Sequence, residues 1–259
     1  MKVLFTSWAW PTHYYPMVPL AWALRASGHE VRVAGTPALA AAATGCGLPA
    51  VALGHDGVDA LARIRTYIPG RGPAPAAGDR RPRALGLFAE LAATIADDLV
   101  SHARRWRPDL VVFEPTEYAG PLAAAVLGIP AARFPWGPDL MYRAALADLE
   151  QEVMAPLCAR HGLDGVDLHG TVTIDPCPPS MQSAEALAPG GVPRVPVRYV
   201  PCNGPGTVAD PQASRPAHSS PRTNSSSVRS SASNTTPPAV RNRSGSLTNK
   251  HARAPSSIT

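Results

Sequence analysis

The feature that most constrains this chain is the alternation of short aliphatic runs with longer amphipathic or Ala-rich segments. Runs typical of buried strands alternate with segments of helical periodicity, and the expected strands are 3–6, 30–34, 49–53, 109–113 and 129–134, with helices at 17–28, 37–45, 86–106 and 116–128. Such alternation is typical of βαβ units, whose strands are parallel and whose helices cover both faces of the sheet. The sequence therefore predicts an α/β fold built on a doubly wound parallel sheet.

The second half of the chain continues this pattern and then loses it. Residues 140–165 are predicted to be helical, with Pro156 either removing a hydrogen bond or starting a second helix. The proline-bounded segments 171–180 and 196–201 are predicted to be edge strands. After about residue 205 there is no aromatic residue and few large aliphatic ones, too little apolar surface to offset the entropy of ordering. We therefore expect a domain at 1–205 and a disordered Ser/Pro/Arg-rich tail at 206–259.

Charge is distributed unevenly along the chain. Seven of the 24 Lys and Arg residues lie after Asp210, where no acidic residue occurs, which leaves 17 basic against 19 acidic residues in 1–210. The basic character therefore belongs to the tail, and the body offers no broad basic face for nucleic acid. No segment reaches the ~18–20 apolar residues of a membrane span, and the N-terminus lacks a signal-peptide core, so we expect a cytoplasmic protein with no membrane partner.

The four cysteines are too far apart in sequence to form a recognisable motif. Cys46, Cys158, Cys177 and Cys202 make no C-x-x-C pair and no zinc-ligand spacing with histidines. The pattern favours buried or incidental thiols in a reducing compartment, and it predicts no metal site.

Three loops are predicted to meet at one edge of the sheet, because ligands of such sheets bind beyond the carboxyl ends of the strands. His13 follows the first strand, Glu114 follows the strand at 109–113, and Trp136–Asp139 follows the strand at 129–134. From the residues alone, His13 is either a general base or a solvated loop histidine. Glu114 is either the partner of that base or an acid that the helix macrodipole favours near a helix N-terminus. Residues 136–139 either contact the acceptor or form a Gly-Pro turn.

Three motifs occur in a fixed order within 1–208: FTSWAWPTHYYPMVPLAWALRASGHEVRVAGTPAL, PDLVVFEPTEYAGPLAAAVLGIPAARFPWGPD, and TIDPCPPSMQ followed by VPVRYVPCNGPG. Together they resemble antibiotic glycosyltransferases of the GT-B fold, above all the actinomycete enzymes that attach deoxysugars to macrolide or aromatic polyketide aglycones. That resemblance implies a Rossmann-like N-terminal acceptor domain facing a nucleotide-sugar domain. No second set of βαβ signals follows, so we expect a truncated or frameshifted product that is inactive alone.

The resemblance also implies a mechanism and its residues. It implies inverting transfer from a nucleotide deoxysugar such as a TDP-sugar, with neither a metal nor a bound cofactor. It places the base at His13 in THYYP and the orienting carboxylate at Glu114 in VVFEP, where other members often carry Asp. Flat apolar rings can stack on a polyketide aglycone, although ordinary packing is the alternative for each one. The acceptor contacts predicted in this way are Trp8, Trp10, Tyr14, Tyr15 and Trp136.

A function of a different class also fits the resemblance. Some members of the family work with an auxiliary protein that docks on the N-terminal domain. The chain is then a non-catalytic acceptor-binding or helper module, and an inert product is the third interpretation. The expected partners are a polyketide aglycone and, for the helper, an auxiliary protein or a full-length glycosyltransferase.

Overall fold

The structure is a computed structural model that describes residues 1–66, 83–188 and 191–207. Residues Met1–Val208 form a compact unit held together by its own internal contacts. The tail expected to be disordered at 206–259 lies outside the described residues from 208 onward. No helix in the described ranges is long and apolar enough to cross a membrane.

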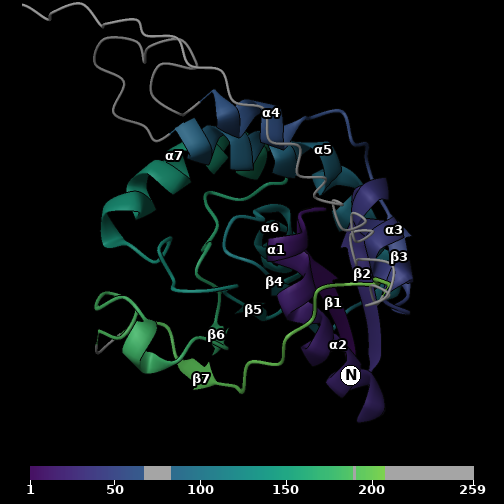
Figure 1. Ribbon diagram of the computed structural model, residues 1–259. Coiled ribbons are helices and arrows are strands. Elements are labelled where there is room, and N and C mark those ends of the chain that lie inside the picture. The colour runs from purple at the N-terminus through teal and green to yellow at the C-terminus, as the bar shows by residue number, and fades with distance from the viewer. Residues whose placement is uncertain (67–82, 189–190, 208–259) are drawn as a thin grey trace, which may run out of the picture. The chain divides into compact units, whose positions relative to one another are not determined.

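A seven-stranded sheet forms the centre of this unit (Figure 1), and all of its neighbouring strands are parallel. In the order β3-β2-β1-β4-β5-β6-β7, the strands are β1 Lys2–Thr6, β2 Glu30–Gly35, β3 Ala50–Ala52, β4 Leu110–Phe113, β5 Ala131–Arg133, β6 Val172–Asp175 and β7 Arg194–Pro196. The predicted α/β doubly wound parallel sheet is therefore confirmed. Its switch point, where successive strands begin to be added on the opposite side, lies between β1 and β4.

Helices cover both faces of the sheet, as its parallel strands require. The described helices are α1 Pro11–Tyr14, α2 Val18–Ala26, α3 Pro37–Gly45, α4 Ala60–Arg65, α5 Arg83–Trp106, α6 Ala119–Leu127 and α7 Ala144–Arg160, with short 3₁₀ turns η1 Tyr15–Met17 and η2 Pro179–Met181. Buried side chains of α2 and α3 share one apolar cluster, and those of α5, α6 and α7 share another. The helices between β1 and β3 thus cover one face, and the helices from α5 onward cover the other.

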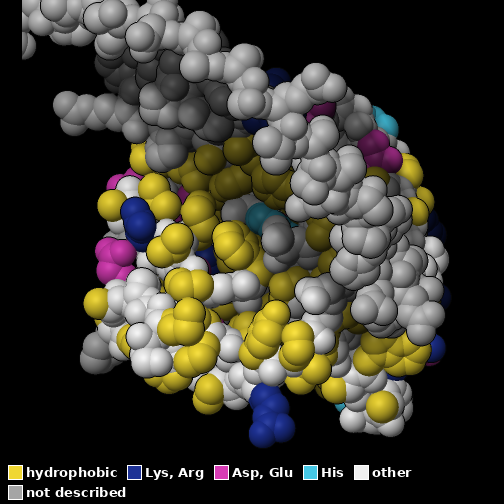
Figure 2. Space-filling model, viewed as in Figure 1, with side chains coloured by type: hydrophobic (Ala, Val, Ile, Leu, Met, Phe, Trp, Pro, Cys, Tyr) yellow, Lys and Arg dark blue, Asp and Glu magenta, His cyan; other side chains and the backbone are white. Residues whose placement is uncertain are grey.

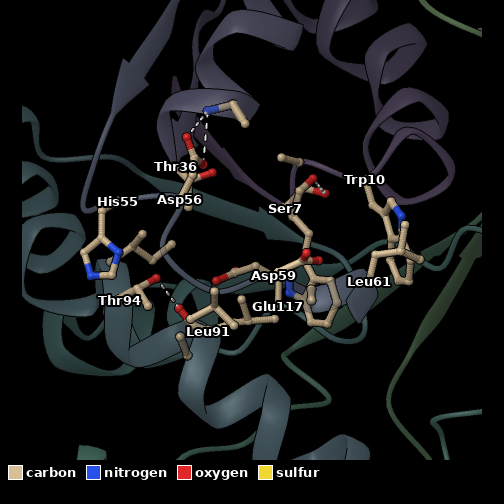
Figure 3. A pocket seen from close by; sticks show the side chains of 17 residues that line it. Ser7, Trp10, Thr36, His55, Asp56, Asp59, Leu61, Leu91, Thr94 and Glu117 are labelled. Atoms are coloured by element: carbon tan, nitrogen blue, oxygen red, sulfur yellow. Dashed lines mark hydrogen bonds between the residues drawn. The ribbon is translucent and has the colours of Figure 1, made fainter. Parts of the chain in front are cut away.

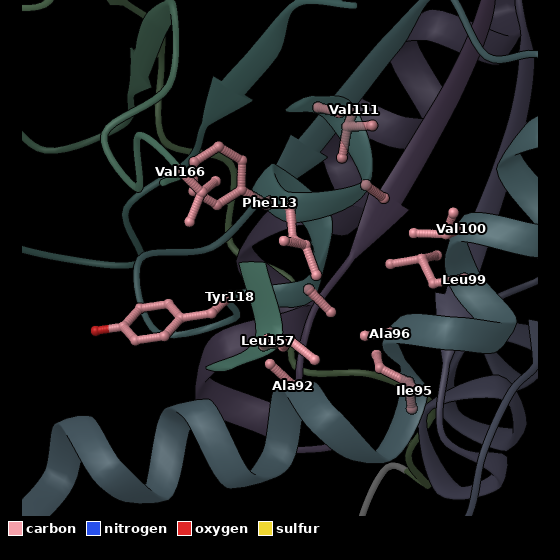
Figure 4. Packing of buried hydrophobic residues seen from close by; sticks show 14 of the residues in the cluster. Ala92, Ile95, Ala96, Leu99, Val100, Val111, Phe113, Tyr118, Leu157 and Val166 are labelled. Atoms are coloured by element: carbon pink, nitrogen blue, oxygen red, sulfur yellow. The ribbon is translucent and has the colours of Figure 1, made fainter. Parts of the chain in front are cut away.

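The pleat of the central strands divides the core between these two clusters. In β1, Leu4 points into the cluster of α5, α6 and α7, whereas Val3 and Phe5 point into the cluster of α2 and α3. Figure 4 shows how α5 contributes to the first cluster, with Leu99 and its neighbours packed towards Val111 on β4. A strand buried on both faces must be apolar at every position, and this explains the uninterrupted VLF and LVVF runs.

Several predicted elements differ from the observed ones. The segment 196–201 is not a strand, because β7 ends at Pro196 after three residues and the chain then leaves the sheet. Strand β6 is not at an edge, since β7 pairs with its outer side. Pro156 neither ends α7 nor begins a new helix. The short helix α4 had no periodicity long enough to predict it.

Candidate functional site

The loops that follow β1 and β4 bring His13 and Glu114 together at the switch point. The two strands are neighbours in register, so their carboxyl ends meet although His13 and Glu114 lie about a hundred residues apart in sequence. His13 Nδ1 lies 3.2 Å from Glu114 Oε2. The Glu114 side chain is fully buried, and that of His13 is only 8% exposed. These two loops therefore meet in the structure, as the sequence predicted.

Three donors hold the Glu114 carboxylate in place. The Thr116 backbone N–H donates to Oε2 at 2.9 Å, and the Thr116 hydroxyl donates to Oε1 at 2.8 Å. The Trp136 indole N–H donates to Oε2 at 3.1 Å. A carboxylate without these bonds would be costly to bury. Thr116 and Trp136 thus fix the position of the group that contacts His13.

This arrangement favours one tautomer of His13. Thr116 Oγ1 also lies 3.3 Å from His13 Nδ1, and its single proton is used toward Glu114. Nδ1 therefore carries the proton and donates it to the Glu114–Thr116 pair, because both neighbours present acceptors there. His13 Nε2 makes no hydrogen bond within the described ranges, so its lone pair is the free basic position.

Three indole rings surround the imidazole of His13. The Trp8 ring is stacked on it at 5.6 Å between centroids, and the rings of Trp10 and Trp136 lie at 5.1 Å and 4.6 Å. Aromatic faces attract cations, so this enclosure suits an imidazole that gains a proton during a reaction. The predicted acceptor contacts Trp8, Trp10 and Trp136 consequently contact the histidine itself.

Glu117, which the sequence patterns did not single out, caps the helix behind this site. Its two carboxylate oxygens accept the backbone N–H groups of Ala119 and Gly120 at 2.9 Å each, at the start of α6. Burial raises the pKa of Glu117 to about 7. The helix-capping alternative considered for Glu114 therefore describes Glu117, three residues later. The sequence EPTE at 114–117 contains both acids, and only the position at which α6 starts shows which of them caps the helix.

A cavity of about 430 Å³ adjoins the two indoles on the first loop. Figure 3 shows its walls, which come from the loop after β1, the segment around α4 and one face of α5, with Glu117 also in the lining. Its lining is mainly apolar, with carboxylates from Asp56 and Asp59. Trp8 and Trp10 line the cavity and also contact His13. In Figure 2, hydrophobic side chains surround a hollow in which a histidine is visible.

Two carboxylates of the loop before α4 accept backbone N–H groups at the starts of helices. Thr36, the N-cap residue of α3, makes no side-chain hydrogen bond to that helix. Asp56 instead accepts the Ala38 backbone N–H at 3.1 Å, which places its acid at the N-terminus of α3. Asp59 caps α4 by accepting the Ala62 backbone N–H at 2.8 Å.

The two tyrosines of the THYYP motif lie apart from the cavity. Tyr14 is buried in the cluster of α2 and α3, and Tyr15 packs against the same cluster at its margin. Burial raises the pKa of Tyr14 well above its usual value. Neither ring lines the cavity beside Trp8, so their predicted contact with an acceptor receives no support from position.

The WGPD loop has two separate roles. Trp136 belongs to the site, whereas Asp139 is buried and pairs with the buried Arg133 of β5 and, at 3.2 Å, with Arg194 of β7. Arg194 also pairs with Asp175 of β6 at 2.7 Å. This ion-pair network ties the loop after β5 to strands β5 and β7, and β7 to β6, so it holds the loop that carries Trp136 in a defined position. Within the described ranges no three His, Cys, Asp or Glu side chains gather as a metal site would require.

Comparison with solved structures identifies the class of this unit. The glycosyltransferase SnogD from Streptomyces nogalater matches with a TM-score of 0.63 at 36% identity, over 81% of this chain and 54% of that one. The rhamnosyltransferase SpnG in complex with spinosyn aglycone matches with a TM-score of 0.61 at 30% identity, over 83% of this chain and 54% of that one. These neighbours are GT-B glycosyltransferases, and the fold here is that of their class.

Within that class the family is specific. Residues 22–220 match the model for the N-terminal domain of erythromycin biosynthesis protein CIII-like proteins, and the chain belongs to this family. A curated relative, 10-deoxymethynolide desosaminyltransferase of Streptomyces venezuelae, is 43% identical over 250 residues, which cover 84% of this chain and 58% of the relative. The chain thus spans little more than half the length of the curated relatives it matches. The resemblance to actinomycete antibiotic glycosyltransferases is confirmed.

Proposed function

We propose that the described unit is the acceptor half of an inverting glycosyltransferase that attaches a deoxysugar to a polyketide aglycone. The observation that carries this proposal is the buried contact of 3.2 Å between His13 Nδ1 and Glu114 Oε2 at the switch point of the sheet. A dyad of this kind leaves His13 Nε2 as a base for a hydroxyl group. The family membership and the desosaminyltransferase named above support the choice of reaction.

In the proposed reaction the aglycone hydroxyl approaches His13 Nε2. The oxygen attacks the anomeric carbon, its proton passes to Nε2, and the bond from that carbon to the nucleoside diphosphate breaks. Glu114 stabilises the imidazolium that forms, as the acid of a hydrolase triad does. The hydrogen bonds from Thr116 and Trp136 keep Glu114 aligned through this change of charge.

The cavity beside Trp8 and Trp10 is the proposed site of the aglycone body. Its volume of about 430 Å³ and its mainly apolar walls suit a macrolactone or a fused-ring aglycone. The two indoles would direct the reacting hydroxyl toward His13. We propose that the nucleotide sugar is bound by protein outside the described residues, either a further domain or a partner chain.

The test separates aglycone binding from sugar transfer. The purified chain is titrated with 10-deoxymethynolide while tryptophan fluorescence is recorded, because Trp8 and Trp10 line the cavity. Transfer is then assayed with TDP-deoxysugars, with and without a full-length family member whose own base histidine has been replaced. We expect aglycone binding by the chain alone and transfer only in the mixture.

Variants assign the roles within that experiment. His13→Ala is expected to lower transfer by about 10²–10⁴-fold, the usual contribution of a general base, with little change in aglycone affinity. His29→Ala is the matched control, because His29 precedes β2 at the opposite end of the strands. Robust turnover by the chain alone would refute the need for an outside sugar-binding protein. Aglycone binding with no transfer in any mixture would favour the helper module instead.

A further inference from the structure

A second cleft lies between the C-terminal half of α5 and the C-terminal end of α7. The two helices pack against each other (Figure 1), and the cleft between them has a volume of about 440 Å³. None of its lining residues lines the cavity beside Trp8, so a ligand here would be separate from the proposed aglycone. The polar side chains of this basic cleft are Asp97, Ser101, Arg104 and Arg105 of α5, with Arg160 and His161 at the end of α7.

The acid in the basic cleft is already paired with groups of α7. Asp97 Oδ1 lies 3.5 Å from Arg160 Nε and 3.1 Å from His161 Nε2. The side chains of Asp97 and Arg160 are 63% and 49% exposed, so the cleft is open to solvent. Three arginines against one aspartate leave a net charge of +2 in the lining.

Two of the arginines have no carboxylate to balance them. In the part of the chain that the structure describes, neither Arg104 nor Arg105 pairs with an acid, and Arg105 Nη1 donates instead to Ser101 Oγ at 2.5 Å. The helix macrodipole favours a cation in the last turn of α5, which accounts for each of these arginines taken singly. It does not account for their lining one cleft together with Arg160, because like charges repel each other. An anion bound between them would relieve that repulsion.

We propose that the basic cleft binds the phosphate group of a small molecule. A guanidinium group presents a planar fork of donors that matches two phosphate oxygens, and Arg104 and Arg105 are both available for such a contact. The Ser101 hydroxyl accepts from Arg105, so its own proton can be donated to a phosphate oxygen. Asp97 would repel the anion, and its contact with Arg160 places its charge on the α7 side of the cleft.

The size of the basic cleft indicates which phosphates fit it best. A volume of about 440 Å³ is within the range of small-molecule sites and exceeds what one inorganic phosphate would fill. A diphosphate could contact the arginines of α5 and Arg160 of α7 at the same time. Such a ligand would connect the two helices, so its binding should raise the temperature of unfolding.

The experiment titrates the full chain by calorimetry with inorganic phosphate, pyrophosphate and TDP in turn. We expect one saturable site that binds pyrophosphate more tightly than phosphate, and a rise in the temperature of unfolding with the same order of ligands. TDP that binds more tightly than pyrophosphate would support the site with a nucleotide as its ligand, and equal binding would support it with free diphosphate. A hexaglutamate peptide that binds more tightly than pyrophosphate would assign the cleft to an acidic protein segment and overturn the proposal.

Variants locate the binding on the chain. Arg104→Gln and Arg105→Gln should each lower pyrophosphate affinity by about 10- to 100-fold, the usual loss for a hydrogen bond between charged groups. Arg65→Gln, which removes an exposed arginine of α4, should bind as the wild type does. Circular dichroism shows whether each variant is folded.

Two results would contradict the phosphate site. Unchanged affinity in both folded α5 variants would place the binding elsewhere, for example among the seven basic residues after Asp210. The absence of saturable binding with all three probes would likewise overturn it. Neither result bears on aglycone binding or sugar transfer, which are measured separately.

Discussion

Replacing Glu150 by glutamine should remove the pH dependence that this acid gives to stability. Glu150 lies on α7, is 4% exposed, and its Oε1 accepts the Tyr118 hydroxyl at 3.2 Å. Its Oε2 lies 4.0 Å from His169 Nε2. Burial raises the pKa of Glu150 from 4.5 to about 7. A neutral glutamine side chain would resemble the protonated acid, which the buried site prefers.

The magnitude follows from the difference in pKa between the two states. The folded state holds the Glu150 proton more tightly than the unfolded state, so the unfolded chain ionises first. Stability from this group is therefore fully present below pH 4.5 and is lost as the pH rises through 7. At about 1.4 kcal/mol per pKa unit, the ionised wild type loses about 3 kcal/mol relative to its protonated form.

Urea unfolding at intervals between pH 5 and pH 8.5 measures this effect. Subtracting the wild-type free energy of unfolding from that of Glu150→Gln cancels the titrating groups that do not interact with Glu150, Glu117 included. The difference should grow in favour of the variant as the pH rises and level off above pH 8. Asp148→Asn, an exposed acid on the same helix, should show no such trend. A difference that stays constant across the whole range would refute the reasoning.

Three further predictions concern the site and the core. Thr116→Val should lower transfer in the mixed assay by about 10- to 100-fold, because a hydrogen bond to a charged group is worth ~1.5–3 kcal/mol. Its aglycone affinity should stay near that of the wild type, and Thr116→Ser, which keeps the hydroxyl, should transfer at nearly the wild-type rate. Equal losses of transfer in the two variants would contradict this. Leu99→Ala should lower the free energy of unfolding in urea by about 2–5 kcal/mol, since Leu99 is fully buried between α5 and the sheet; a loss below about 1 kcal/mol would show that the cluster collapses into the space. Gly120→Ala should lower the free energy of unfolding by about 1–3 kcal/mol in the same measurement, because the added Cβ would meet Thr6 Oγ1 and Glu117 Oε2. An unchanged urea midpoint would mean that these two side chains can move away from the new methyl group.

The order of strands and helices could be predicted because each buried strand of a parallel sheet is apolar throughout. The runs Val3–Phe5 and Leu110–Phe113 carry this signal without ambiguity. The segment 196–201 was misleading, because its alternating Val and Tyr residues resemble a strand although most of them are exposed after β7 ends. Helix α4 is too short for its periodicity to be visible. Local patterns thus predicted the long elements and missed those fixed by tertiary contacts.

The site was predictable in outline and not in detail. His13 and Glu114 could be placed because each follows a strand whose position in the sheet was clear. Thr116 gave no signal, since a hydroxyl two residues after an acid is common and its importance depends on the turn that bends it back to Glu114. The four cysteines were predicted to be buried or incidental thiols, and in the structure Cys158 and Cys177 are buried while Cys46 and Cys202 are partly exposed.

The position of β1 in the middle of the sheet has a consequence for how the chain folds as it is synthesised. β1 pairs with β2 on one side and with β4 on the other, and β4 begins about a hundred residues later. The first three strands can therefore assemble early, while the other edge of β1 stays unpaired until Leu110–Phe113 has left the ribosome. An exposed apolar edge is a template for aggregation, and non-local pairing of this kind is slow. Slow translation between β3 and β4 would therefore prolong the most vulnerable state of the nascent protein.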